Sequence, residues 1–138
     1  MDALALRLAV GDQLPPFTRL TDFPAWNRFA AVNDEFVLIH MDEEAGRAAG
    51  LNGAIGMGNL QWSYLHNLVR DWLGADGRIL TMECQFRATN QRGQTVSAKG
   101  TVAGLSRGDH GLVATLDVWT ETAEGQQLAV GHCTVLLD

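Results

Sequence analysis

The segment from Asn33 to Gly58 contains the residue types that acid–base catalysis needs. Two acids, Asp34 and Glu35, precede a histidine, His40, by six and five residues. A carboxylate and an imidazole can share one water molecule when both lie within about 3 Å of the protons that are transferred. The sequence therefore holds a candidate acid–base pair.

A glycine-rich helix start follows this pair. Gly56 and Gly58 let a substrate approach the backbone closely. The free N–H groups at a helix N-terminus stabilise negative charge that develops beside them. An acid–base pair beside free helix amides is the set of groups that enolate chemistry requires. The same residues also fit structural roles, with His40 a satisfied surface or core histidine and the acids capping a helix.

One long helix is predicted from Ile55 to Leu73, where it is ended by Gly74. A helix of about 18 residues is about 27 Å long, close to the width of a sheet of four or five strands at about 4.8 Å per strand. Such a helix fits inside a curled sheet. Its apolar residues recur at spacings of three and four: Met57, Leu60, Tyr64, Leu65, Leu68 and Trp72.

Shorter elements precede the long helix. A helix from Pro24 to Val32 begins with Pro24 in its first turn and Thr21 or Asp22 as its cap. A second short helix runs from Asp42 to Ala49 and is closed by Gly50. The stretch from Met1 to Val10 is either a strand or a frayed end.

The second half, from Arg78 to Asp138, predicts a four-stranded antiparallel meander, because turn residues divide it into segments of similar length. In the first segment apolar and polar residues alternate, so one face is expected to be buried by Leu80, Met82, Cys84 and Phe86. The later strands are Thr95 to Leu105, Leu112 to Thr122 and Gln127 to Leu137. Helices followed by such a sheet predict an α+β fold with helix packed on sheet.

Composition indicates one domain spanning residues 1–138. Apolar residues make up 46% of the chain and the net charge is −6, which excludes a disordered composition and the cationic surface of a nucleic-acid binder. Cys84 and Cys133 form no CxxC motif, and no apolar run is long enough to cross a membrane. We expect a cytoplasmic, reduced protein that contacts neither nucleic acid nor membrane.

The stretch from Trp26 to about Gly104 resembles the MaoC-like hot-dog dehydratases, the family of (R)-specific enoyl-CoA hydratases. The central part from Leu60 to Gly77 is also similar to small MaoC subunits that act on steroid side-chain thioesters. This resemblance implies a hot-dog fold, with a long central helix wrapped by an antiparallel β-sheet. The matching pieces are Phe36 to Asp42, Arg47 to Gly50, Gly58 at the helix start, and Gly93 to Val96.

The resemblance implies a lyase of fatty acid metabolism that hydrates trans-2-enoyl-CoA to (R)-3-hydroxyacyl-CoA, or catalyses the reverse dehydration. Glu35, or Asp34 in its place, would activate a water that adds at Cβ. His40 would share that water and help to deliver a proton to Cα. The N–H of Gly58 would hold the thioester oxygen.

The chain departs from the family pattern at four positions: Glu35 stands where the family has an aspartate, Val37-Leu38 replaces Asn-Pro, and Met57 replaces a histidine. The changes at Val37, Leu38 and Met57 support an alternative, a non-catalytic hot-dog subunit of a heteromeric hydratase. An acyl-CoA thioesterase is a third hypothesis. Hot-dog thioesterases usually carry their carboxylate on the central helix, where this chain offers only Asp71.

Substrate contacts are expected from Met57, Leu60, Trp62, Phe86 and Arg87. One of three cations near the same turn is expected to bind the coenzyme A phosphates: Arg87, Arg92 or Lys99. Coenzyme A is part of the substrate and no cofactor is expected. The histidines show no metal-ligand spacing, and no GxGxxG or P-loop motif occurs. An unpaired sheet edge is normally covered, so we expect a homodimer or a heteromer with another hot-dog chain.

Overall fold

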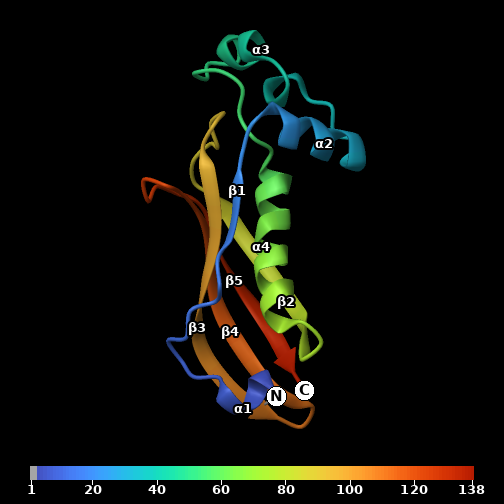
Figure 1. Ribbon diagram of the computed structural model, residues 1–138, viewed down its shortest axis with the longest axis vertical. Coiled ribbons are helices and arrows are strands. Elements are labelled where there is room, and N and C mark those ends of the chain that lie inside the picture. The colour runs from blue at the N-terminus through green and yellow to red at the C-terminus, as the bar shows by residue number, and fades with distance from the viewer. Residues whose placement is uncertain (1–2) are drawn as a thin grey trace.

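A five-stranded antiparallel sheet and one long helix, α4, form the body of the molecule in the computed structural model (Figure 1). The structure describes residues 3–138. Helices α2 and α3 lie beyond one end of the sheet, and the chain ends N and C lie near the other (Figure 1). The elements are α1 (Leu4–Arg7), β1 (Phe17–Leu20), α2 (Phe23–Asn33), the 3-10 turn η1 (Leu38–His40), α3 (Glu43–Ala48), α4 (Gly58–Leu73), β2 (Gly77–Phe86), β3 (Thr95–Gly108), β4 (Gly111–Thr122) and β5 (Gln127–Leu137).

The sheet has the strand order β1-β3-β4-β5-β2, so the predicted four-stranded meander is wrong in one respect. Strands β3, β4 and β5 follow one another as hairpins, but β2 pairs with β5 instead of β3. Residues 87–94 must therefore cross three strand spacings, about 14 Å, from one side of the sheet to the other. This crossing takes them past the start of α4. Strand β1, which the sequence did not indicate, adds to β3 at the opposite edge.

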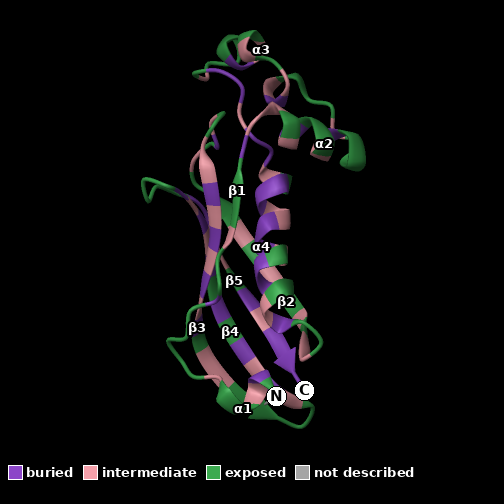
Figure 2. Cartoon of the chain, viewed as in Figure 1, coloured by how far each residue is buried: buried purple, intermediate pink, exposed green. Residues whose placement is uncertain are grey.

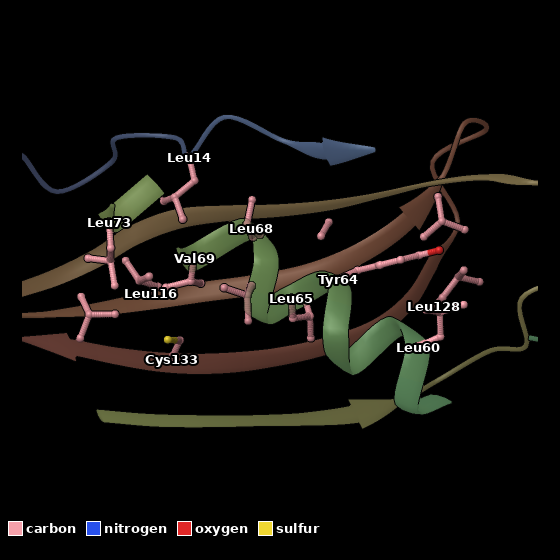
Figure 3. Packing of buried hydrophobic residues seen from close by; sticks show 14 of the residues in the cluster. Leu14, Leu60, Tyr64, Leu65, Leu68, Val69, Leu73, Leu116, Leu128 and Cys133 are labelled. Atoms are coloured by element: carbon pink, nitrogen blue, oxygen red, sulfur yellow. The ribbon is translucent and has the colours of Figure 1, made fainter. Parts of the chain in front are cut away.

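Helix α4 packs its apolar face on the sheet (Figure 3). Figure 2 shows the buried residues along α4 and the strands it covers. The helix starts at Gly58 instead of the predicted Ile55, because the N–H of Ile55 is bound by the carbonyl of Ile39 in an extended segment. Gly74 ends the helix at a φ of +54°, a left-handed conformation that glycine adopts without strain.

One row of residues runs straight across the sheet beneath the first two turns of α4. The pairing register places Phe86 of β2 opposite Ala129 of β5, which is itself opposite Thr120 of β4. Thr120 is opposite Ala98 of β3, and Ala98 is opposite Phe17 of β1. Small residues therefore occupy the three middle strands and aromatic residues the two edges. The small residues leave room for the helix to lie close to the sheet.

Strand β2 buries only part of the face that alternation predicted. Met82 and Cys84 pack against the core as predicted. A bulge between Ile79 and Thr81 turns Leu80 outward, where it is exposed, and Ile79 packs against the core in its place. The expected burial of Leu80 is wrong because one extra residue in a strand reverses the faces on one side of it. Phe86 lies on the helix side but is 52% exposed at the end of the strand.

The short helices follow their capping residues. Asp22 caps α2, its carboxylate accepting from the N–H of Phe23 at 2.7 Å, and Asp42 caps α3 through the N–H of Ala45. Both helices thus agree with the sequence prediction within a residue or two. The N-terminal stretch forms the short helix α1 instead of a strand, and its first two residues lie outside the described range. No helix in the described part of the chain is long and apolar enough to cross a membrane.

Candidate active site at the start of α4

His40 is held against the segment that leads into α4. It ends the turn η1, is 8% exposed, and its Nδ1 lies 2.8 Å from the carbonyl oxygen of Ile55. A carbonyl oxygen only accepts, so Nδ1 carries the hydrogen of this bond. In the neutral ring Nε2 is then a free acceptor. His40 is therefore oriented to take a proton at a fixed atom.

Glu35 contacts the first turn of the same helix. Its Oε2 accepts from Asn33 Nδ2 at 3.0 Å and from Asn59 Nδ2 at 3.3 Å. Asn59 is the second residue of α4, so the carboxylate is tied to the N-terminus of that helix. The neighbouring Asp34 ends α2 at a φ of +51° and is exposed. The structure therefore ties Glu35, and not Asp34, to α4 by a side-chain hydrogen bond.

The N-terminus of α4 leaves backbone amides free. Met57 precedes the helix without capping it through its side chain, and its carbonyl accepts from the amides of Leu60 and Gln61. The amide of Gly58 has no hydrogen-bond partner among residues 3–138. A free amide at this place carries partial positive charge and can receive an oxygen that becomes negative.

The loop between β2 and β3 fixes the approach to this helix start. The N–H of Gly56 donates to the carbonyl of Asn90 at 2.8 Å, and Ile55 forms a bridge with Gln91. The buried side chain of Asn90 donates in turn to Thr21 Oγ1 at 2.9 Å and Gln94 Oε1 at 3.2 Å. The bonds from Gly56 to Asn90 and from Asn90 to Thr21 join segments distant in sequence, so the position of Gly58 is set by the whole fold.

Arg92 joins the two helices beyond the sheet to the same loop. Its guanidinium lies 2.7 Å from Asp22 and 3.2 Å from Glu43, and it covers the ring of Phe23. The other oxygen of Glu43 accepts from the N–H of Ala54. The hydrogen bond from Arg92 lowers the pKa of Asp22, and the bond to Asp22 raises the pKa of Arg92. This cluster joins the cap of α2 and the first residue of α3 to the segment that leads to Gly58.

No family model matches the sequence, and no curated protein matches it. Solved structures match nearly the whole chain. An (R)-hydratase from A. caviae involved in PHA biosynthesis has a TM-score of 0.86 at 25% identity, covering 97% of this chain and 100% of that one. The ChsH1-ChsH2 complex from Mycobacterium tuberculosis has a TM-score of 0.83 at 18% identity, covering 94% and 98%. A MaoC-like dehydratase from Rhodospirillum rubrum has a TM-score of 0.79 at 20% identity, covering 94% and 93%.

The chain has the MaoC-like hot-dog fold. The resemblance seen in the sequence and the α+β class with a helix wrapped by an antiparallel sheet are both confirmed. In this MaoC-like fold the matched glycine, Gly58, is the first residue of the central helix. The matched histidine and Glu35 both contact the few residues around that glycine.

Of the residues expected to contact the substrate, only some lie near the start of α4. Phe86 lies over Gly58, so close that a β-carbon added to the glycine would be 3.0 Å from the ring. Met57 and Leu60 are buried in the core, and Trp62 packs edge-on against His66 with ring centres 4.8 Å apart. Arg87 lines a hollow of about 680 Å³ together with Glu83, Gln85 and Trp119. It follows Phe86 directly, and successive strand residues point to opposite faces, so Arg87 is directed away from Gly58.

Three residues of this site escaped the sequence prediction: Asn59, Gln61 and Asn90. Asn59 holds Glu35, Gln61 accepts from Thr120, and Asn90 holds the chain at Gly56. A signal was available for Gln61, since it is a polar residue beside Leu60 and Tyr64 on the apolar side of the helix. No local pattern marks Asn59 or Asn90. No group of three or more potential metal ligands occurs in the described residues.

Proposed function

We propose that this chain hydrates trans-2-enoyl-CoA to (R)-3-hydroxyacyl-CoA, or catalyses the reverse dehydration. One observation carries the proposal: a carboxylate and an imidazole are each hydrogen-bonded to residues around one free helix amide. Glu35 is tied to Asn59 and His40 to Ile55, and Gly58 lies between these two contact points. The likeness to an (R)-hydratase at 25% identity supports it.

The mechanism uses the chain's own groups in fixed roles. The thioester oxygen accepts from the Gly58 amide, and a water molecule lies between Glu35 and Nε2 of His40. As the water oxygen bonds to Cβ, its proton passes to Glu35, and the electron pair of the double bond moves toward Cα and the thioester oxygen. That same proton is then relayed from Glu35 through Nε2 of His40 to Cα, so both side chains end unchanged. Pre-oriented donors of this kind stabilise the developing enolate.

This mechanism needs no metal or redox group, and coenzyme A enters only as part of the substrate. We place the reaction in the cytoplasm. Two free cysteines, Cys84 and Cys133, agree with this proposal, because disulfides are rare in a reducing compartment.

We further propose that the site is completed by a second hot-dog chain, either a copy of this one or a different one. Strand β2 pairs only with β5, which leaves its outer edge open in the described chain. Exposed apolar side chains also gather between Glu35 and His40, at Phe36, Val37 and Leu38. A partner that covers both features would bury apolar surface and satisfy an unpaired strand.

A non-catalytic subunit is the second candidate function. The exposed side chains of Val37 and Leu38 favour it, because they replace the Asn-Pro of the family signature with an apolar surface suited to a partner. One structural neighbour is a complex of two named chains, ChsH1 and ChsH2. A thioesterase is less well supported, because Asp71 is exposed in the last turn of α4, about 20 Å along the helix from Gly58.

The test is the loss of enoyl absorbance when the purified chain is mixed with crotonyl-CoA and longer enoyl-CoA substrates. We expect hydration by the wild type and none by His40→Ala. An undiminished rate in His40→Ala would remove this mechanism. A wild-type chain that is inactive alone but restores activity to a partner hot-dog subunit would establish the non-catalytic role. Release of free thiol from saturated acyl-CoA would establish a thioesterase.

A further inference from the structure

Gln61 is a polar side chain held almost completely inside the molecule. It lies in the first turn of α4 and is 3% exposed. Its carbonyl oxygen Oε1 accepts a hydrogen bond from the hydroxyl of Thr120, at 2.6 Å. Thr120 belongs to the row of small residues beneath the helix, so Gln61 reaches down to the centre of the sheet.

The orientation of the Gln61 amide is fixed by its neighbours. The backbone N–H of Ala129 donates to Thr120 Oγ1 at 3.1 Å, so the hydroxyl already accepts one hydrogen bond. Its own proton then needs an acceptor, which is Gln61 Oε1. This arrangement directs the amide nitrogen Nε2 away from Thr120.

The Nε2 of Gln61 is left without a hydrogen-bond partner anywhere in residues 3–138. In that range Trp26 Nε1 is the side-chain nitrogen that is both unpartnered and fully enclosed. Gln61 Nε2 is therefore a free donor that still reaches accessible space. A donor without an acceptor in the protein, in a side chain this enclosed, needs its acceptor from outside the chain, either a water molecule or a ligand.

Gln61 lies close along α4 to Gly58, whose amide is proposed to hold the thioester oxygen. Gln61 lies three residues after Gly58, which is one turn and a rise of about 4.5 Å on neighbouring parts of the helix surface. Tyr64 lies one turn further, packs its ring on Phe17 at 5.5 Å, and has no partner for its hydroxyl in the described chain. The side of α4 that begins at Gly58 thus carries two more polar groups among apolar neighbours.

We propose that Gln61 determines acyl specificity by donating from Nε2 to an oxygen atom, a ketone or hydroxyl, that the acyl chain carries beyond Cβ. The inference rests on the proposed function for the class of ligand, a coenzyme A thioester. A purely apolar chain leaves the donor unpaired, so the site favours an oxygenated chain over a hydrocarbon chain of equal length. Gln61 binds the part of the substrate that does not react.

Binding of saturated acyl-CoA pairs tests this without any hydration step. One member of each pair has a hydrocarbon chain and the other a ketone at successive positions beyond Cβ, and calorimetry on the full chain gives both dissociation constants. We expect the wild type to bind one of the ketones about ten-fold or more tightly than its hydrocarbon partner. Gln61→Met, which keeps the volume and removes the donor, should reduce that preference to within about two-fold.

Two further variants separate specificity from folding. Thr120→Val removes the group that orients the amide, and we expect an intermediate preference. Gln126→Met makes the same change at an exposed turn and should keep the full wild-type preference. Thermal unfolding of Gln61→Met shows whether the variant is folded, and hydrocarbon-chain binding by that variant shows whether its site is intact.

The outcomes distinguish this inference from the proposed function. Hydration by the wild type with no preference for any ketone overturns the inference alone, as does a preference that survives in Gln61→Met. A preference that disappears in Gln61→Met, in a chain that never hydrates enoyl-CoA, supports the inference and counts against the proposed catalysis. A wild type that binds no thioester overturns both.

Discussion

The ring of Phe86 lies directly over Gly58. A β-carbon added to the glycine would be 3.0 Å from Cζ of that ring and 3.1 and 3.3 Å from its two Cε atoms. Phe86 ends β2 and is half exposed, while Gly58 begins α4. The end of the edge strand thus covers the amide proposed to hold the thioester oxygen.

Gly58→Ala is therefore expected to reduce activity more than stability. The methyl group would push the Phe86 ring aside, and the ring can move because it is at the end of a strand and half exposed. A displacement near 1 Å at a reacting centre costs roughly ten- to hundred-fold in rate. Enoyl-CoA hydration and thermal unfolding should show this loss with a nearly unchanged midpoint. Gly108→Ala is the matched control, since its nearest atom would be 4.0 Å away.

Gly56→Ala is expected to reduce stability more than activity. A β-carbon there would be 2.5 Å from Asn90 Oδ1 and 3.0 Å from Trp26 Nε1, and both of those side chains are buried. Neither can move without disturbing the core, so we expect a loss of about 1–3 kcal/mol in the free energy of unfolding. Urea unfolding measures it. A variant as stable as the wild type would show that the 54–57 segment is free to move.

The two neighbouring acids can be separated by matched amide substitutions. Glu35→Gln keeps the shape but removes the carboxylate that Asn59 contacts, and we expect the hydration rate to fall by about 10²- to 10⁴-fold. Asp34→Asn makes the same change of charge one residue earlier. Asparagine adopts the left-handed backbone of this position readily, so the rate should stay close to that of the wild type. The reverse result would assign the base to Asp34.

Local elements could be predicted from the sequence because their causes are local. The spacing of Tyr64, Leu65 and Leu68 indicated α4. The sequence offered Thr21 or Asp22 as the cap of α2, and the structure has Asp22 there. The strands after Thr95 were bounded by turn residues and match the structure closely. The partner of β2 could not be predicted, because pairing with β5 depends on where a crossing loop runs over the whole sheet. The same holds for the bulge that exposes Leu80.

The residues of the candidate site likewise fall into two groups, those that the sequence could indicate and those that it could not. Glu35, His40 and Gly58 lie within one stretch of chain, so their types and spacing were visible in the sequence. The bond from Asn59 to Glu35 spans 24 positions, and Asn90 reaches Gly56 from the loop after β2. Polar side chains that act over such distances resemble ordinary surface residues in the sequence. Their roles emerge only when the fold brings the segments together.

Cys133 is expected to be unreactive until the protein unfolds. Burial raises the pKa of its thiol to about 12 from 9.0, and burial also raises the pKa of Cys84. The thiolate is the reactive form, so a thiol reagent at pH 8 should label the partly buried Cys84 slowly and Cys133 only in denaturant. Mass spectrometry of the labelled peptides decides between them. Rapid labelling of Cys133 in the folded protein would contradict its position in the core.

The raised pKa of Cys133 also sets a pH dependence. Because the folded value lies above the unfolded one, its contribution to stability is complete below pH 9.0 and is lost as the pH rises toward about 12. Cys133→Val has no proton to lose, so the difference in unfolding midpoint between it and the wild type should change across that range. A constant difference would count against the shift.

The contribution of Asp22 to stability depends on pH in the opposite direction, and the change occurs at acid pH. The hydrogen bond from Arg92 lowers its pKa below 3.8, so the ion pair contributes stability above that value, and the contribution is lost as the pH falls through the lower folded pKa. Asparagine caps helices about as well as aspartate, so Asp22→Asn removes the charge but keeps the cap of α2. We expect Asp22→Asn to unfold at a lower temperature than the wild type at neutral pH, with the difference vanishing below the folded pKa. Asp22→Ala removes the cap as well and should be less stable at every pH. Equal midpoints for Asp22→Asn and the wild type at neutral pH would show that Arg92 does not stabilise this end of the molecule through Asp22.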